Sequence, residues 1–176
     1  KLTNKNLVQR ITIEIDEKKI MTKKILPSHK IKTQLTQVIN VEGPTMFCDI
    51  TEENLGKDLE IPCVENTLKE QFIKFYGARF TTNESLAHLV VKGQFKTQSK
   101  GEPYKYSESS PAVYNAYAEL KFNIFDNNNQ KELYSKTIND KGVSYISFED
   151  AGKKGCEKMT EQISKSIFEE IVKALE

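Results

Sequence analysis

The hydrophobic pattern of the chain changes period near Ser147. Before this residue, several segments alternate apolar and polar positions, which is typical of half-buried strands. After it, apolar residues recur every three or four positions, as on the buried face of a helix. The order of these segments predicts an α+β fold in which a mostly antiparallel sheet packs against two main helices and carries an N-terminal β-hairpin.

The second half of the chain gives the clearest strand predictions, over residues 88–97, 114–125 and 131–138. Gly93 falls in the inward row of the first strand and predicts a bulge or a close approach of backbone. Asp126–Asn129 is expected to form a hairpin turn, because Asp and Asn tolerate the left-handed region that such turns use.

Two helices are predicted, over residues 62–76 and 148–175. The first begins near Pro62 and ends before Gly77, a residue suited to a left-handed C-cap. Its apolar stripe is predicted as Val64, Leu68, Phe72 and Phe75. Ser147 is expected to cap the second helix. The buried stripe of that helix is predicted as Cys156, Met159, Ile163, Ile167, Ile171 and Leu175.

The N-terminal region adds further strands. Isoleucines alternate with polar residues over 9–16, and the segments 20–26 and 35–41 are predicted as second and third strands. The first two of these strands are interpreted as a hairpin over 9–26. The region 1–45 that contains it is expected to extend the same sheet or to belong to a neighbouring domain. The segment 46–61 has no clear period and is interpreted as a loop with short pieces of structure. A length of 176 residues favours a single α+β domain over 1–176.

Composition argues against a nucleic-acid partner and against a transmembrane segment. The net charge is only +1, which argues against strong general affinity for nucleic acid, since phosphate binding needs a concentrated positive field. The sequence contains no apolar run near the roughly 18 residues that span a membrane, so no transmembrane segment is expected. Because the sequence starts at Lys1 rather than Met, we expect a mature or trimmed form, from which a signal peptide or lipid anchor can have been removed.

The three cysteines lack the close pairs typical of zinc sites, so neither a metal nor another cofactor is predicted. Two interpretations stay open. A bridge between Cys48 and Cys63 would stabilise the fold by about 3 kcal/mol on the chain-entropy model. Alternatively, all three cysteines are small buried hydrophobes, and core packing is the simpler account of Cys156 on the last helix.

No catalytic residues are predicted, and the chain is not expected to be an enzyme. The sequence has no Gly-x-Ser-x-Gly, phosphate-binding glycine loop or His-Glu-x-x-His motif. His29 and His88 are far apart, and His88 is interpreted as an ordinary residue at the start of a strand. A hydrolase whose site is assembled from distant residues remains an alternative, because the members of a triad meet only in the fold.

Four of the six candidate binding residues lie in the polar connection 99–117. It gathers Tyr104, Tyr106, Tyr114 and Tyr117, and tyrosine supplies large contact area at low entropy cost. The alternative is that two of these tyrosines are strand residues and the other two decorate a loop. Lys92 and Lys96 precede them and would either meet an anionic lipid head group or polysaccharide, or keep an exposed strand soluble.

Three stretches carry a family resemblance: YGARF, AHLVVKGQF and YAELKFNIFDNNNQKELYSKT, followed by the C-terminal helix. In this order, over residues 62–175, the chain resembles small α+β domains of bacterial cell-envelope proteins. These are the amino-terminal domain of TolB, LpoB, CsgG and flagellar assembly protein T, with LptE as a neighbour of broadly similar order.

The resemblance implies a non-catalytic binding or assembly factor in the periplasm or anchored at the outer membrane, of the lipoprotein type. Its partner would be another envelope component, expected to be a protein, contacted through the 99–117 connection. The alternative implied by LptE is a lipid- or glycan-binding protein.

Overall fold

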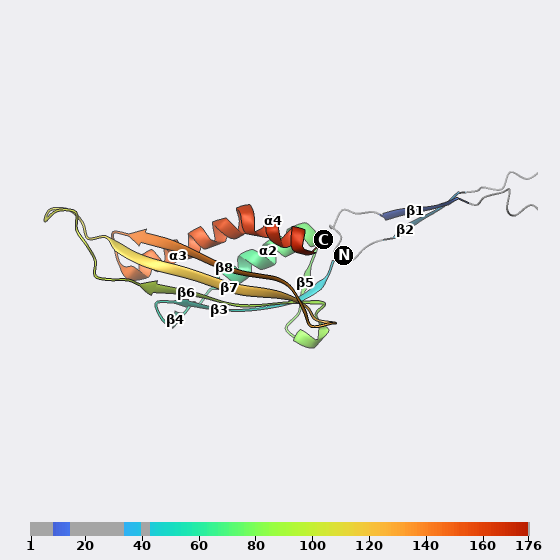
Figure 1. Ribbon diagram of the computed structural model, residues 1–176, viewed down its shortest axis with the longest axis horizontal. Helices are drawn as coiled ribbons and strands as arrows, with labels where there is room; N and C mark the ends of the chain where they lie inside the picture. The colour runs from blue at the N-terminus through green and yellow to red at the C-terminus, as the bar shows by residue number, and fades with distance from the viewer. Residues whose placement is uncertain (1–8, 15–33, 40–42, 176) are drawn as a thin grey trace, which may run out of the picture.

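The computed structural model describes residues 9–14, 34–39 and 43–175 (Figure 1). A six-stranded mixed sheet carries helices on one face, so the predicted α+β class is confirmed. The strands of this sheet are β3 (Thr45–Asn54), β4 (Lys57–Asp58), β5 (Arg79–Phe80), β6 (Leu89–Ser99), β7 (Tyr114–Asp126) and β8 (Lys131–Ser144). The helical elements are α2 (Val64–Tyr76), η1 (Glu84–Leu86), α3 (Phe148–Gln162), the π-helical turn η2 (Ile163–Ile167) and α4 (Phe168–Leu175).

The sheet is ordered β4-β3-β6-β7-β8, with β5 beside β3. Strands β6, β7 and β8 form an antiparallel meander, whereas β3 runs parallel to β6. The short strand β4 pairs antiparallel with one end of β3, and β5 pairs parallel with the other. The connection from β3 to β6 carries α2, as a parallel crossover requires.

The core lies between the sheet and the helices. Every residue of the stripe predicted for the last helix is buried, although η2 interrupts its α-helical hydrogen bonds between α3 and α4. In α2 the stripe is confirmed except at its end, where Phe75 is exposed and Tyr76 is buried. Tyr76 lies four positions after Phe72 and therefore on the same face.

Most predicted ends of elements are confirmed. Ser147 caps α3 by accepting the Asp150 N–H at 3.1 Å, and Gly77 takes a left-handed conformation with φ of 62°. In the β7–β8 turn the left-handed residue is Gln130, with φ of 56°, rather than an asparagine. Asp126 instead accepts the Asn128 N–H at 2.9 Å, which fixes the turn from its first residue.

The segment 46–61, interpreted from sequence as a loop, contains the central strand β3. Met46 and Ile50 face the core as an alternating strand requires, but the next inward positions are Glu52 and Asn54. Two buried polar residues in the inward row break the apolar alternation, so the period cannot be recognised.

Two glycine positions explain how closely the layers approach. A Cβ at Gly93 would lie 2.5 Å from the Lys121 carbonyl oxygen, so the close approach predicted there is confirmed. A Cβ at Gly152 of α3 would lie 1.9 Å from Asn54 Oδ1 of β3. Glycine at 152 thus lets α3 rest directly on the polar end of β3.

The N-terminal region contains β1 (Gln9–Glu14) and β2 (Gln34–Ile39), which pair antiparallel as a two-stranded sheet apart from the six-stranded one. These strands agree with the predicted strands at 9–16 and 35–41. The predicted strand at 20–26 and His29 lie outside the described residues. The assignment of 1–176 to one domain stays a prediction.

Candidate functional site: an exposed aromatic patch

The connection between β6 and β7 carries exposed tyrosines at one end of the sheet (Figure 1). The rings of Tyr104 and Tyr106 meet edge to face with centroids 5.2 Å apart, and their hydroxyls are 3.1 Å apart. Tyr106 is 78% exposed. Tyr104 is 40% exposed, so both rings present apolar surface to solvent while they contact each other.

The connection is ordered by its own backbone. Tyr104 and Val113 exchange two backbone hydrogen bonds, of 3.2 and 2.8 Å, which continue the β6–β7 ladder outwards. Beyond them Ser107 and Ser110 close a turn, with the Ser110 N–H donating to the Ser107 carbonyl at 3.1 Å. The tyrosines are therefore presented on a defined hairpin.

Two exposed residues missed by the sequence analysis precede α3. Tyr145 is 62% exposed and Ile146 is 74% exposed. Ser144 at the end of β8 pairs with Tyr114, and Val113 beside it pairs with Tyr104, so Tyr145 leaves the sheet next to the hairpin that carries Tyr106. The pKa of the Tyr106 hydroxyl is raised, mainly by its hydrogen bond to Tyr104. We call Tyr104, Tyr106, Tyr145 and Ile146 the aromatic patch. Consecutive large apolar residues beside the helix cap Ser147 were the signal that could have revealed the second pair.

The other two predicted tyrosines lie outside this patch. Tyr114 is half-buried at the start of β7, with its ring edge to face against Phe148 at 5.2 Å. Tyr117 is exposed on β7, and the ammonium of Lys100 lies 5.2 Å from the centre of its ring. Tyr114 therefore packs against the start of α3, whereas Tyr117 remains accessible.

The two predicted lysines are engaged in ion pairs. Lys92 Nζ lies 2.8 Å from a carboxylate oxygen of Glu84, and Lys96 Nζ lies 3.3 Å from Glu119. Hydrogen bonds from Lys121 first, and then Lys96, hold the pKa of Glu119 below its ordinary value. Lys92 therefore has a carboxylate partner of its own, whereas Lys96 shares Glu119 with Lys121, whose Nζ lies 3.2 Å from the same carboxylate oxygen.

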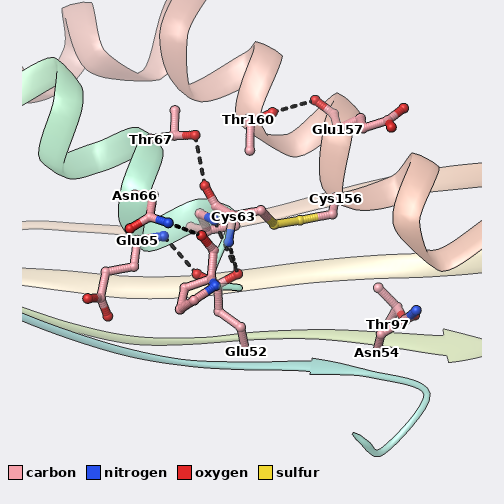
Figure 2. Close-up of a disulfide and its surroundings, with 12 residues drawn as sticks. Glu52, Asn54, Cys63, Glu65, Asn66, Thr67, Thr97, Cys156, Glu157 and Thr160 are labelled. Atoms are coloured by element: carbon pink, nitrogen blue, oxygen red, sulfur yellow. Dashed lines mark hydrogen bonds between the residues drawn. A yellow bond between two sulfur atoms is a disulfide. The ribbon is translucent and has the colours of Figure 1, made fainter. Parts of the chain in front are cut away.

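A disulfide joins Cys63, just before α2, to Cys156 in α3 (Figure 2). The two Cα atoms are 6.8 Å apart. Both interpretations of the cysteines from sequence are therefore wrong: Cys63 does not pair with Cys48, and Cys156 is more than a buried hydrophobe. The partners are 93 residues apart in sequence, so only the packing of α3 beside α2 brings them together.

The buried carboxylate of Glu52 holds the beginning of α2 (Figure 2). One oxygen accepts the backbone N–H groups of Cys63 at 2.8 Å and Val64 at 3.1 Å, and the other accepts that of Glu65 at 2.7 Å. These are N–H groups that have no partner within a helix, and a negative charge there also favours the helix dipole. Glu52 of β3 therefore caps α2, although it lies 11 residues before Cys63 in the sequence.

The same residues raise the question of a metal site, because donor atoms of Glu52, Cys63 and Cys156 lie within 4.8 Å of one another. The donor set does not fit a metal ion. The two sulfurs are bonded to each other, whereas thiolates are the cysteine ligands of metals. The carboxylate already accepts three N–H groups.

Cys48 and His88, which could in principle take part in catalysis, are accounted for by their surroundings in the fold. Burial, with the charge of Glu65 adding to it, raises the pKa of the Cys48 thiol to about 12, so this thiol stays neutral. His88 Nδ1 accepts the Thr45 N–H at 3.1 Å, and its backbone pairs with the same strand. The hydrolase alternative gains no support from these contacts.

Comparisons with known proteins find solved structures with low structural similarity and low sequence identity to this chain. No family model matches the chain, and no curated protein matches it. A hypothetical protein from Chlamydia trachomatis has a TM-score of 0.43 and 8% identity, covering 72% of this chain and 96% of its own. A DUF330 protein from Xanthomonas campestris has a TM-score of 0.41 and 10% identity, covering 70% and 82%.

A minor lipoprotein from Acinetobacter baumannii has a TM-score of 0.35 and 10% identity, covering 67% of this chain and 90% of its own. None of the three is TolB, LpoB, CsgG, flagellar assembly protein T or LptE, so that resemblance stays a prediction. With TM-scores below 0.5, no function is transferred from these structures. Among the described residues, no helix has the length and apolar character needed to cross a membrane.

Proposed function

We propose that this chain is a non-catalytic binding domain of the bacterial cell envelope that contacts another envelope protein through the aromatic patch. The observation that supports it is the position of four exposed side chains, Tyr104, Tyr106, Tyr145 and Ile146, at the end of the sheet where the hairpin leaves β6 and β7 and the chain leaves β8 for α3. Exposed apolar clusters of this kind mark interaction sites. Tyrosine is also enriched among the residues that dominate interface energetics.

The disulfide supports a location outside the cytoplasm. Cytosolic thiols are kept reduced, whereas disulfides persist in oxidising compartments such as the bacterial periplasm. The Cys63–Cys156 bridge joins two core elements, α2 and α3, and so belongs to the folded structure. This location agrees with the periplasmic or outer-membrane-anchored placement implied by the sequence resemblance.

A protein partner is favoured over an anionic lipid or polysaccharide. Binding to an anionic surface depends on a cluster of free cations. Lys92 and Lys96, which would supply them, are already paired with Glu84 and Glu119. The aromatic patch instead offers apolar area and hydroxyl groups, the chemistry of protein interfaces.

Site-specific photocrosslinking tests the proposal in the organism that makes the protein. A photoreactive phenylalanine analogue replaces Tyr106 in one variant and Leu86 in a control, since Leu86 is also exposed, at 66%, but lies in η1. We expect a discrete crosslinked envelope protein from position 106 and not from position 86.

Adding Tyr145→Ser to the position-106 variant should weaken that crosslink, because Tyr145 belongs to the same patch. Equal crosslinking from both positions, or a crosslink indifferent to Tyr145→Ser, would contradict the proposal. A crosslink to lipid or glycan alone would favour the alternative partner class.

A further inference from the structure

A groove of about 730 Å³ lies beside the disulfide, between α3 and the segment 55–61 that leaves β3. Phe95 and the Cys63–Cys156 bridge line it, together with Leu55 and Leu59. Ile61, 77% exposed, also lines it. The volume falls in the range of ligand-binding pockets, which are usually apolar with a few polar groups around them.

The walls of the groove are fixed by tertiary contacts. Near the start of α3, Asn54 Nδ2 donates to the Glu149 carbonyl at 3.1 Å, and Asn54 Oδ1 accepts the Thr97 hydroxyl at 2.5 Å. Two turns further along α3, Cys156 is bonded to Cys63. A groove held in this way needs little ordering when it binds, which lowers the entropic cost of association.

The charged residues around the groove are mainly acidic. Six charged side chains line it: Lys57, Asp58, Glu60, Glu149, Lys153 and Glu157. Lys153 Nζ is 3.5 Å from Glu149 and offsets its charge. Asp58, Glu60 and Glu157 form no ion pair within the described part of the chain, and Lys57 is the remaining cation among these six residues. The groove therefore combines an apolar floor with an excess of negative charge.

We propose that this groove binds a basic, apolar peptide segment of a partner protein, in which large apolar side chains are flanked by Lys or Arg. The apolar side chains would cover Ile61 and Leu59, and the cations would lie near Glu60 and Glu157. Complementary charge selects such a segment over an acidic one of equal apolar content. The inference concerns a different surface from the aromatic patch and does not rest on the proposed function.

Two matched synthetic peptides test this inference by calorimetry on the oxidised protein. One has the sequence Lys-Leu-Phe-Leu-Lys and the other Glu-Leu-Phe-Leu-Glu, both with blocked ends. We expect the lysine peptide to bind about tenfold more tightly, a difference of about 1.4 kcal/mol, and salt to reduce the preference. A Glu60→Lys/Glu157→Lys variant should reverse it, because both side chains are exposed and line the groove.

The control variant is Glu161→Lys/Glu169→Lys, which makes the same charge change at exposed positions that do not line the groove. It should keep the wild-type preference. Ile61→Asp should weaken the binding of the glutamate peptide more than that of the lysine peptide, because it removes apolar surface from the groove and adds a negative charge that attracts only lysine. Equal binding of both peptides, failure of either to bind, or a preference that both charge variants change alike would overturn the proposal. Tyr106→Ser should leave peptide binding unchanged, which separates this result from the test of the aromatic patch.

Discussion

Two regions of the molecule treat polar and apolar groups in opposite ways. Around Glu52, Cys63 and Cys156, which we call the anchor region, polar groups are buried and each has a partner. In the aromatic patch, large apolar side chains are exposed, and Tyr104 and Tyr106 contact each other. A buried polar group with every bond made is there for the fold, whereas an exposed aromatic cluster contributes little to it. The contrast assigns stability to the first region and agrees with the binding role proposed for the second.

The largest expected effect comes from opening the disulfide. The bridge closes a loop of 93 residues, for which the chain-entropy model gives about 4 to 5 kcal/mol. Reduction should therefore remove a large share of a typical stability of about 5–15 kcal/mol. The measurement is urea unfolding with and without dithiothreitol.

A Cys63→Ala/Cys156→Ala variant provides the control, because its unfolding should not respond to the reductant. Cys48 is the remaining cysteine, and its half-buried, neutral thiol should play no part. An unchanged urea midpoint for the reduced wild-type protein would show that the disulfide does not contribute to the stability of the fold.

Replacing Glu52 by Gln is expected to cost about 2–3 kcal/mol, since hydrogen bonds to a charged group contribute more than neutral ones and the amide turns a donor towards N–H groups. Glu52 accepts three of them at the beginning of α2. The matched control is Glu53→Gln, the next residue of β3, which is half-buried and should change stability by less than about 0.5 kcal/mol. Similar losses in both variants, measured by urea unfolding, would show that capping is not the reason.

The anchor region also marks the limit of what the sequence could predict. Regular periods identified β6, β7 and both main helices, because their inward positions are apolar. The Ser147 cap could be identified because serine before an apolar helical pattern is a known N-cap signal. Strand β3 could not be identified, since Glu52 and Asn54 occupy inward positions and their partners lie in α2 and α3. The disulfide has the same origin: nothing local links Cys63 to Cys156.

The candidate site was partly predictable for a related reason. Tyr104 and Tyr106 stand out as a local cluster in a polar connection, and the structure places them side by side. Tyr145 lies at the same end of the sheet only because the end of β8 pairs with the start of β7, and the sequence does not show this pairing. The sequence could not show that Glu84 and Glu119 face Lys92 and Lys96, so the role of these lysines in binding stays a prediction.

The smallest expected effect on stability belongs to the aromatic patch. Tyr106→Ser and Tyr145→Ser remove side chains that are mostly in water, so each should change the free energy of unfolding by less than about 0.5 kcal/mol. The same urea series used for Glu52→Gln gives the comparison. A loss above about 2 kcal/mol would mean that the patch supports the fold, and the contrast between the two regions would fail. If Tyr145→Ser weakens the crosslink from position 106 but keeps the free energy of unfolding, damage to the core is excluded as the cause. Destabilising the core would lower both the crosslink and the free energy of unfolding.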